Sequence, residues 1–359
     1  MIKIVHIIGS LGYGGAEKLL YDLCRKIDKE KFSVSIVVFQ DNNPLAKQFE
    51  AAGIKIKYFR KKGPLDFAFV RKMSKYLVSI NPDIVHTHLF AGDYWGGKAA
   101  EQADVPFIVS TKHDTLNEGR MRTYLGRKKR RSFDRIIAIS EAIQEFLIKQ
   151  EKVSHEKISI IHNGVDVNKF LLEDSKLFAT DDLLIGSVGR LSKEKGHKHL
   201  IRACRFLKNW NWKLSLVGDG PMRKELEHLA LFLGIEEKVH FVGMVDDVRD
   251  YLGKMDVFVL PSVSEGLSLA LIEAALAGRF IIATDVGGVP EIVTNKETGL
   301  LFKPKNIEQL VTHLNWVDEH RDEARKMASR LQKEVIQKFD INKVIREYEA
   351  VYEGLVTKS

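Results

Sequence analysis

The sequence lacks several features that would assign a protein to a class at once. It has no run of about 18 apolar residues, so no transmembrane helix is predicted. The only cysteines, Cys24 and Cys204, lie far apart, which excludes a disulfide scaffold and favours a reduced, cytosolic setting. The short apolar run near the start ends without a cleavage region, so we expect no secretory signal. Neither a P-loop nor an RNP, zinc-finger or helix-turn-helix signature is present.

What is present is the composition of a globular protein. The chain has 359 residues, of which 45% are hydrophobic and 29% charged. These fractions exclude broad disorder and a collagen-like chain. Because one domain commonly has about 100–200 residues, the length predicts two domains.

Positive charge is concentrated in the first half. Residues 1–170 carry a net charge of +10, and residues 171–359 carry −2. The densest basic run consists of Arg127, Lys128, Lys129, Arg130 and Arg131. Tyr124 and Phe133 are interleaved with these cations, which favours an amphipathic surface helix at an anionic membrane. The alternative is a solvated helix face that only keeps the protein soluble.

Short apolar runs alternate with helix-length stretches along the whole chain. The predicted strands are residues 2–8, 33–39, 54–59, 84–87, 107–110, 135–139 and 158–161 in the first half, and 183–188, 213–217, 239–242, 257–260, 280–283 and 299–302 in the second. Several are apolar almost throughout, as a parallel sheet covered on both faces requires. The alternation indicates βαβ units and an α/β fold.

The strand pattern starts again after a weakly periodic stretch near residues 166–182. We therefore predict two doubly wound, Rossmann-like domains of similar size, residues 1–165 and residues 166–340. Apolar residues recur at helical spacing in the last stretch. A final helix within residues 341–359 is expected to dock back on the first domain.

The informative residues lie just after predicted strands. In open α/β sheets, ligands bind beyond the carboxyl ends of the strands. Both halves have residues suited to binding at those ends, which implies two sheets whose carboxyl ends face each other across a deep cleft. In the first half, Gly14 and Gly15 form a glycine-rich turn into a helix, where free N–H groups would suit an anion. Taken alone, the glycines are also compatible with a tight turn of the backbone without a ligand, since glycine is common in such turns. They also lack the spacing of a dinucleotide fingerprint.

In the second half, a basic loop and a pair of carboxylates follow strands. Arg190 and Lys195 are suited to neutralising a diphosphate, although a solvated surface loop has a similar composition. Glu265 is expected in a loop and Glu273 two turns into an apolar helix that ends near Gly278. A lone carboxylate in such a helix needs a partner, and a pair of sugar or ribose hydroxyls would supply one.

Three histidines lie at or just after the ends of predicted strands of the first half. His86 and His88 are candidate metal ligands, but no carboxylate or third histidine stands at a recognised metal spacing, so we expect no metal. His113, followed by Asp114, is either an oriented acid–base pair or part of a polar loop. In isolation the pair favours the polar loop.

Together these motifs resemble the GT-B-fold retaining glycosyltransferases of family 4, the class known as glycosyl transferases group 1. The matching residues run in family order over most of the chain: Gly14–Glu17, His88, His113 with Asp114, His162–Asp166, Gly189–Leu191 with Lys195 and Gly196, Gly218–Pro221, Glu265–Glu273, and Gly287–Glu291. Individually only the paired glutamates are specific.

The resemblance implies transfer of a sugar from a nucleotide-diphosphate sugar, with retention at the anomeric carbon and without a metal or other cofactor. By similarity, Arg190 and Lys195 would hold the diphosphate. Glu273 would bind the ribose and Glu265 the donor sugar, while His113 would lie beside that sugar and stabilise positive charge. Backbone donors and contacts to the nucleotide would come from Gly14, Gly15, Gly218, Gly243, Met244, Ser268 and Leu269.

The acceptor side is the least defined. Its contacts are expected from the first domain, near His88, Asp93 and the basic run 127–131. The basic half favours a lipid-linked glycan on the inner leaflet, hence a cytoplasmic protein that is peripheral to the membrane and acts in envelope polysaccharide or glycolipid synthesis. A UDP-sugar is weakly favoured as donor, and GDP-mannose is the alternative.

Other functions fit parts of the pattern. A nucleotide-sugar epimerase of the GT-B shape would use acidic and histidine residues to add and remove the nucleotide. A phosphorylase that uses pyridoxal phosphate fits less well, because the chain is short and no cofactor lysine is evident. A basic nucleic-acid-binding protein would bind a random duplex tightly at physiological salt and turn over no nucleotide sugar, so we expect no nucleic-acid partner.

Overall fold

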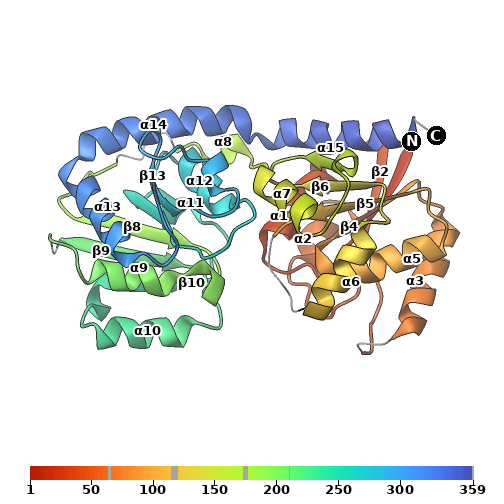
Figure 1. Ribbon diagram of the computed structural model, residues 1–359, viewed down its shortest axis with the longest axis horizontal. Coiled ribbons are helices and arrows are strands. Elements are labelled where there is room, and N and C mark those ends of the chain that lie inside the picture. The colour runs from red at the N-terminus through yellow and green to blue at the C-terminus, as the bar shows by residue number, and fades with distance from the viewer. Residues whose placement is uncertain (64–65, 115–119, 173–176, 210, 358–359) are drawn as a thin grey trace. The chain divides into compact units, whose positions relative to one another are not determined.

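A computed structural model describes residues 1–63, 66–114, 120–172, 177–209 and 211–357 of the chain. The chain forms two compact units, Met1–Gly164 with Ile341–Ser359, and Val165–Asp340 (Figure 1). The first boundary lies after Gly164, whereas the sequence predicts it after residue 165. The second boundary lies after Asp340, as predicted.

The first unit is built on a seven-stranded sheet with the strand order β3-β2-β1-β4-β5-β6-β7. Its strands are β1 (Ile2–Ile7), β2 (Phe32–Val38), β3 (Lys55–Tyr58), β4 (Ile84–His88), β5 (Phe107–Lys112), β6 (Arg135–Ala138) and β7 (Ile158–Ile160). All neighbouring strands run parallel. Each strand falls within or overlaps a predicted one, which confirms the doubly wound α/β fold of this half. Every residue of the central strand β4 is buried, although His86, Thr87 and His88 are polar.

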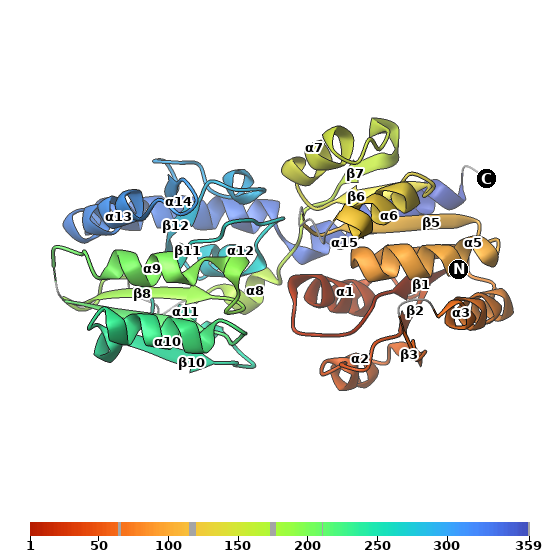
Figure 2. The same cartoon turned by 60° about the horizontal axis from the view of Figure 1, so that its bottom comes forward.

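Helices surround this sheet (Figure 2). They are α1 (Gly15–Lys26), α2 (Ala46–Ala51), α3 (Phe67–Ile80), α4 (Leu89–Ala91), the π-helical turn η1 (Gly92–Gly96), α5 (Gly97–Gln102), α6 (Arg120–Arg130), α7 (Glu141–Lys149) and the 3₁₀ turn η2 (His155–Lys157). Side-chain caps fix two of the helix starts. Asp66 accepts a hydrogen bond from the amide of Phe69 at α3, and Ser140 accepts one from the amide of Ile143 at α7.

The last helix, α15 (Ile341–Val356), belongs to the first unit although it follows the second in sequence. Ile341, Val344, Ile345, Tyr348 and Tyr352 are buried in one core cluster with Ile4 of β1 and Phe32 of β2. In Figure 1 this blue helix lies over the red and orange strands of that unit. The apolar stripe at helical spacing thus has the core of the first unit as its partner.

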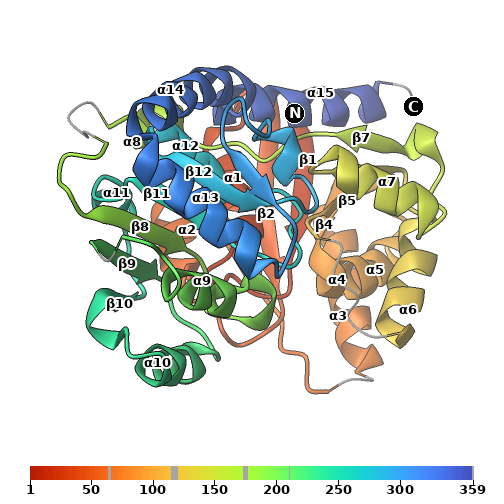
Figure 3. The same ribbon diagram turned by 60° about the vertical axis from the view of Figure 1, so that its left-hand side comes forward.

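The second unit has a six-stranded parallel sheet with the order β10-β9-β8-β11-β12-β13 (Figure 3). Its strands are β8 (Leu183–Val188), β9 (Trp212–Val217), β10 (Val239–Gly243), β11 (Val257–Leu260), β12 (Phe280–Thr284) and β13 (Leu300–Phe302). Its helices are α8 (Val167–Phe170), α9 (His197–Cys204), α10 (Arg223–Phe232), α11 (Arg249–Leu252), α12 (Leu269–Leu276), α13 (Ile307–Glu319) and α14 (Arg321–Lys338), with 3₁₀ turns η3 (Lys193–Lys195), η4 (Glu236–Lys238) and η5 (Val289–Glu291). The predicted second Rossmann-like domain is confirmed.

Each unit buries its own apolar core. One large cluster, which includes Trp212 of β9 and Phe280 of β12, fills the second unit. Among the described residues of the first unit, the buried apolar side chains form three clusters. In the part of the chain that the structure describes, no helix combines the length and apolarity needed to cross a bilayer.

Candidate active site

The second unit joins a cation and a carboxylate at the carboxyl end of its sheet. Lys195 follows β8, and its Nζ donates to Oε1 of Glu265 in the loop after β11, at 2.7 Å. The hydroxyl of Ser262 donates to the same oxygen at 2.6 Å. The Glu265 side chain is 7% exposed and that of Lys195 27% exposed. The two residues that the sequence places after different strands therefore share one cluster, to which the structure adds Ser262.

Backbone contacts hold the loops of this cluster together. Gly196 has a φ of +68°, and a Cβ there would lie 2.1 Å from the carbonyl oxygen of Pro261. Gly287, after β12, has a φ of +53°, and its Cβ would lie 1.9 Å from the carbonyl oxygen of Glu265. Any side chain at these positions would separate the loops, so the two glycines set the position of Glu265.

Glu273 lies in α12 on the same unit. The helix begins at Leu269, and the hydroxyl of Ser268 caps it by accepting from the amide of Leu271 at 3.3 Å. Glu273 is 5% exposed. It lies slightly more than one turn into α12, whereas the sequence predicts two turns, because the residues after Glu265 form a loop before the helix starts.

Three further predicted site residues of this unit are Arg190, which lies two residues after β8, Gly218, which follows β9, and Gly243, which ends β10. Arg190 is exposed. The amide of Gly218 donates to the carbonyl oxygen of Gly243 at 2.8 Å, so this N–H is already used within the protein. Met244, the next residue, is 54% exposed. The expected contact of Gly218 with a ligand must therefore come from atoms other than its amide.

On the first unit, Gly14 and Gly15 begin α1. The carboxylate of Glu17 folds back over this turn, because a Cβ on Gly14 would lie 2.4 Å from its Oε2. Burial raises the pKa of Glu17, and hydrogen bonds from the amides of Glu17 and Gly12 oppose the rise. The carboxylate of Glu17 therefore accepts from its own amide and from that of Gly12, in the glycine-rich turn before α1. These two N–H groups are used within the protein.

His113 directly follows β5 and is partly buried. Burial lowers its pKa to about 4, although the nearby carboxylates of Asp114 and Asp93 act to raise it. The imidazole is therefore neutral at pH 7. Asp114 forms an ion pair with Lys112 at 3.2 Å.

Two family models match consecutive parts of the chain. Residues 13–169 match the model described as Glycosyltransferase Family 4, and residues 168–334 match Glycosyl transferases group 1. The putative teichuronic acid biosynthesis glycosyltransferase TuaC of Bacillus subtilis strain 168 is 30% identical over 298 residues, which cover 77% of this chain and 72% of that protein. The chain belongs to this family of glycosyltransferases.

Two further proteins resemble this glycosyltransferase. The UDP-Gal:alpha-D-GlcNAc-diphosphoundecaprenol alpha-1,3-galactosyltransferase of Escherichia coli is 27% identical, and the match covers 81% of this chain and 80% of that one. The crystal structure of Anabaena Alr3699/HepE in complex with UDP-glucose has a TM-score of 0.89 at 24% identity, covering 99% of this chain and 100% of that chain. The structural match shows that the two proteins share a fold.

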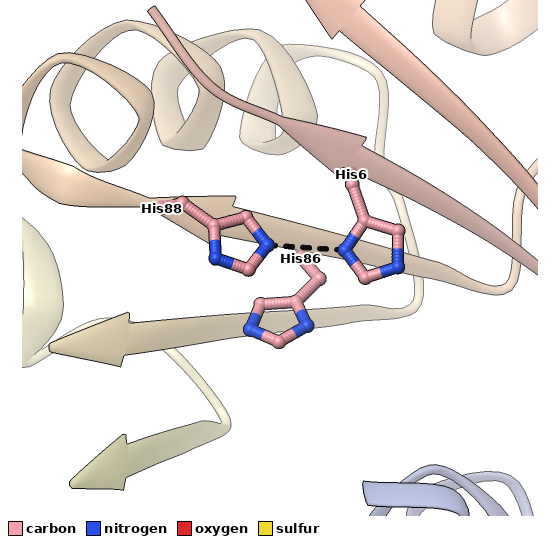
Figure 4. Close-up of side chains that lie close together, drawn as sticks. All are labelled: His6, His86 and His88. Atoms are coloured by element: carbon pink, nitrogen blue, oxygen red, sulfur yellow. Dashed lines mark hydrogen bonds between the residues drawn. The ribbon is translucent and has the colours of Figure 1, made fainter. Parts of the chain in front are cut away.

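The glycosyltransferase also contains a histidine cluster that the sequence does not reveal. His6 of β1 stands opposite His86 of β4 in the parallel register, and His88 is two residues further along. One ring nitrogen of each lies within 4.8 Å of those of the others, and all three side chains are buried (Figure 4). His6 is missed from the sequence because its proximity arises only when β1 and β4 pair.

The structure corrects the expected roles of Asp93 and Arg130 on the acceptor or membrane side. Arg130 donates to Asp93 at 2.8 Å and to Glu151 at 2.6 Å, and all three side chains are buried. Asp93 also accepts from the hydroxyls of Thr87 and Ser110, both at 2.7 Å. Asp93 and Arg130 thus hold η1 and α6 to the first unit, and neither offers its charge to a surface.

The other cations of the basic run also differ from one another in exposure and in contacts. Successive residues of a helix are turned by about 100°, so five consecutive cations cannot share one face. Lys128 is exposed, Arg127 is half-buried, and Lys129 pairs with Glu101. Arg131, just past α6, is exposed and donates from Nε to the carbonyl oxygen of Glu151 at 2.9 Å. His88 is buried against other histidines, so it does not reach an acceptor directly.

Proposed function

We propose that the chain is a retaining, metal-independent glycosyltransferase that transfers a sugar from a nucleotide-diphosphate sugar to a lipid-linked glycan in cell-envelope polysaccharide or glycolipid synthesis. The observation that carries this proposal is the cluster of Lys195, Glu265 and Ser262 at the carboxyl end of β8 and β11. Parallel α/β sheets bind ligands at this edge.

Lys195 and Arg190 supply the charge that a departing diphosphate requires. When the bond from the sugar to the diphosphate breaks, negative charge develops on the phosphate oxygens. Cations that are already in place stabilise this charge without having to reorganise during the reaction. Lys195 is held by Glu265 at 2.7 Å, so its ammonium group is positioned before the donor arrives. Lys195, together with the exposed Arg190, would perform the task that a divalent metal performs elsewhere, which is the reason to propose a metal-independent reaction.

The two glutamates bind hydroxyl groups of the donor. Glu273 accepts from the ribose and Glu265 from the donor sugar, while the backbone near Ser268 and Leu269 donates to the diphosphate. Oε1 of Glu265 already accepts from Lys195 and Ser262, which makes it a poor nucleophile. Retention is therefore assigned to attack on the face that the leaving diphosphate vacates, with no covalent sugar–enzyme intermediate.

His113 acts beside the sugar as a neutral ring. Because burial lowers its pKa to about 4, the ring carries no charge at pH 7. A neutral imidazole can hydrogen-bond to a sugar that develops positive charge without repelling it. The resemblance implies a position next to the donor sugar, and the lowered pKa of His113 suits that position.

The donor is proposed to be a UDP-sugar, with GDP-mannose as the alternative. The HepE structure is described as a complex with UDP-glucose, and the name of the E. coli relative specifies UDP-Gal. That relative's name also specifies a diphosphoundecaprenol acceptor. A lipid-linked acceptor and the net positive first half of the chain together favour peripheral association with the inner face of the membrane.

The test is a panel of UDP-, GDP- and ADP-sugars with and without EDTA, read by thermal stabilisation and then by slow donor hydrolysis. One donor is expected to raise the melting temperature and to be hydrolysed equally well in EDTA. Glu273→Gln should abolish the stabilisation, whereas Glu334→Gln, on the exposed face of α14, should not. The anomer of the released sugar, followed by NMR, reports whether configuration is retained.

Four results would contradict parts of this proposal. No response to any donor would remove the transferase activity. An absolute need for a divalent ion would remove metal independence. Epimerisation of the sugar without an acceptor would assign the site to the epimerase reaction instead. A glycosyl adduct trapped on a side chain during turnover would exclude attack on the vacated face.

A further inference from the structure

Four histidines form a continuous chain of rings in the first unit. Nδ1 of His6 lies 3.1 Å from Nε2 of His88, and Nδ1 of His88 lies 3.5 Å from Nε2 of His113. His86 stacks on His88 with 4.3 Å between ring centroids. His6 belongs to β1, His86 and His88 belong to the neighbouring β4, and His113 directly follows β5, which pairs with β4 (Figure 4 shows His6, His86 and His88).

All four rings are neutral at physiological pH. Burial lowers the pKa of His6 to about 3 and that of His113 to about 4. The pKa values of His86 and His88 are also far below the usual range, because of burial and then of the neighbouring histidines. A neutral imidazole has one N–H donor and one acceptor nitrogen. In each hydrogen bond between two rings, one ring donates and the other accepts. The nitrogen on which the first ring carries its proton decides this direction for all of them.

His6 sets this direction. Its Nε2 is buried, and within the described chain it has no hydrogen-bond partner. A proton on Nε2 would be a buried donor without an acceptor, which is rarer in proteins than an unused acceptor. With the proton on Nδ1 instead, His6 donates to Nε2 of His88. His88 must then carry its own proton on Nδ1, from which it donates to Nε2 of His113.

We propose that His6 and His88 are positioning residues that fix the proton of His113 on Nδ1, so that His113 presents an N–H donor to the substrate. His113 is only partly buried, so this second nitrogen is the one left for a ligand once Nε2 accepts from His88. In the opposite direction, His113 would present a bare nitrogen and act as a base. The tautomer follows from the first unit alone, and only its use on the donor sugar rests on the proposed function.

His86 and the C-terminal helix hold the chain in place. Nδ1 of His86 is 2.7 Å from the hydroxyl of Tyr352, and Nε2 is 2.8 Å from that of Thr111. Both nitrogens of His86 are thus used in hydrogen bonds, which fix the orientation of the ring on which His88 stacks. Tyr352 belongs to α15, so the last helix of the chain contributes to the orientation of a ring that follows β5.

The same hydrogen bonds argue against a metal ion among His6, His86 and His88. An ion would have to replace the contacts of His86 with Tyr352 and Thr111 and the contact between His6 and His88.

The tautomer is measured directly by two-bond ¹H–¹⁵N correlation spectra of histidine-labelled enzyme at pH 7.5 without ligands. We expect His6, His88 and His113 to carry protons on Nδ1. A proton on Nε2 of His113, or fast averaging between both nitrogens, would overturn the proposal. Shifts of the His6, His86 and His88 signals on addition of one equivalent of Zn²⁺ would overturn it in favour of a metal site.

Variants connect the tautomer to catalysis. His88→Leu removes the donor to His113, and its kcat should fall about 3- to 10-fold, the value of one hydrogen bond, with KM for the donor little changed. In His88→Asn, the amide nitrogen stands near the place of Nδ1 and should restore most of kcat and of the His113 signal. Equal loss in both variants would contradict the positioning role. An enzyme without transferase activity would refute the proposed function, while the spectra would still decide the tautomer.

Discussion

The two sheets differ in what they present at their carboxyl ends. The first unit presents buried, neutral imidazoles, with His113 at the partly exposed end of the chain of rings. The second presents charged groups, with Lys195 and Glu265 joined at 2.7 Å and Glu273 nearby in sequence on α12. Both sets follow strands of the same kind of sheet, so the topology alone does not distinguish their roles.

The difference in charge distinguishes them. A diphosphate that leaves with growing negative charge needs fixed cations, which the second unit supplies. A sugar that develops positive charge is not repelled by a neutral ring, which the first unit supplies. We infer that the second unit binds the nucleotide diphosphate and that the first acts on the sugar. Each of the following predictions changes one side of this comparison.

The largest expected effect is on the stability of the first unit alone. Arg130→Leu leaves Asp93 and Glu151 buried without their cation, and breaking such a network typically costs about 3–5 kcal/mol. Urea unfolding should show this loss in the first unit, while UDP binding by the second unit persists. Lys128→Leu, at an exposed position of the same helix, is the control. A loss below about 1 kcal/mol for Arg130→Leu would mean that the network is not structural.

The next effect is on the leaving group. Lys195→Ala should lower kcat/KM about 10²- to 10³-fold, the range for removing one electrostatic contact to a transition state. It also leaves Glu265 with only the Ser262 hydroxyl on Oε1. Steady-state kinetics with the preferred donor measure the change, and Lys193→Ala, exposed in the same loop, should be near wild type. Similar losses in both variants would show only a general charge effect.

A smaller effect is expected from the first unit. His113→Ala should lower kcat about 10- to 100-fold, because one positioned hydrogen bond to the sugar is lost while the diphosphate contacts remain. Single-turnover rates at saturating donor measure it. His155→Ala, in the distant turn η2, serves as the control. A change in KM with kcat intact would mean that His113 only binds the ground state.

Acid should destabilise the first unit. A buried histidine with a lowered pKa stays neutral when folded but takes up a proton when unfolded, so stability is lost as the pH falls below about 6.5. For His6, whose pKa is about 3, the ceiling is about 1.4 kcal/mol per pH unit. Between pH 7.5 and 5, the melting temperature should fall less steeply with decreasing pH in His6→Phe than in wild type. Equal slopes would mean that His6 is not the buried neutral group described above.

The smallest effect concerns the membrane. Lys128 is an exposed cation of α6, and reversing it in Lys128→Glu should weaken binding to vesicles of 30% phosphatidylserine about 5- to 20-fold, since each cation near such a surface contributes about 1 kcal/mol. Donor hydrolysis should be unaffected. Unchanged vesicle binding would assign this face to solvation only.

The sequence predicts the two sheets well, because parallel strands read as apolar runs that are separated by helix-length stretches. It also predicts that Lys195 and Glu265 belong to one edge, since both follow strands. It does not reveal Ser262, whose hydroxyl reaches Glu265 only through the shape of the loop. His6 is likewise hidden, because the pairing of β1 with β4 brings it to His88.

The sequence prediction that Arg130 lies on the acceptor or membrane side is wrong for a different reason. Within a run of five cations it reads as a surface residue, and nothing local marks it as buried. Its partners, Asp93 and Glu151, lie 37 and 21 residues away, so only the tertiary fold reveals the ion pairs. The start of α12 was misplaced for a local reason, since the apolar residues after Glu265 suit a helix as well as a buried loop.

Calorimetric titration of UDP in EDTA into wild type, Lys195→Ala and His113→Ala tests the central claim most directly. The division of roles predicts tight binding to wild type without a metal, near-equal affinity for His113→Ala, and at least tenfold weaker binding to Lys195→Ala. Equal losses in both variants, or binding only when Mg²⁺ is added, would contradict it.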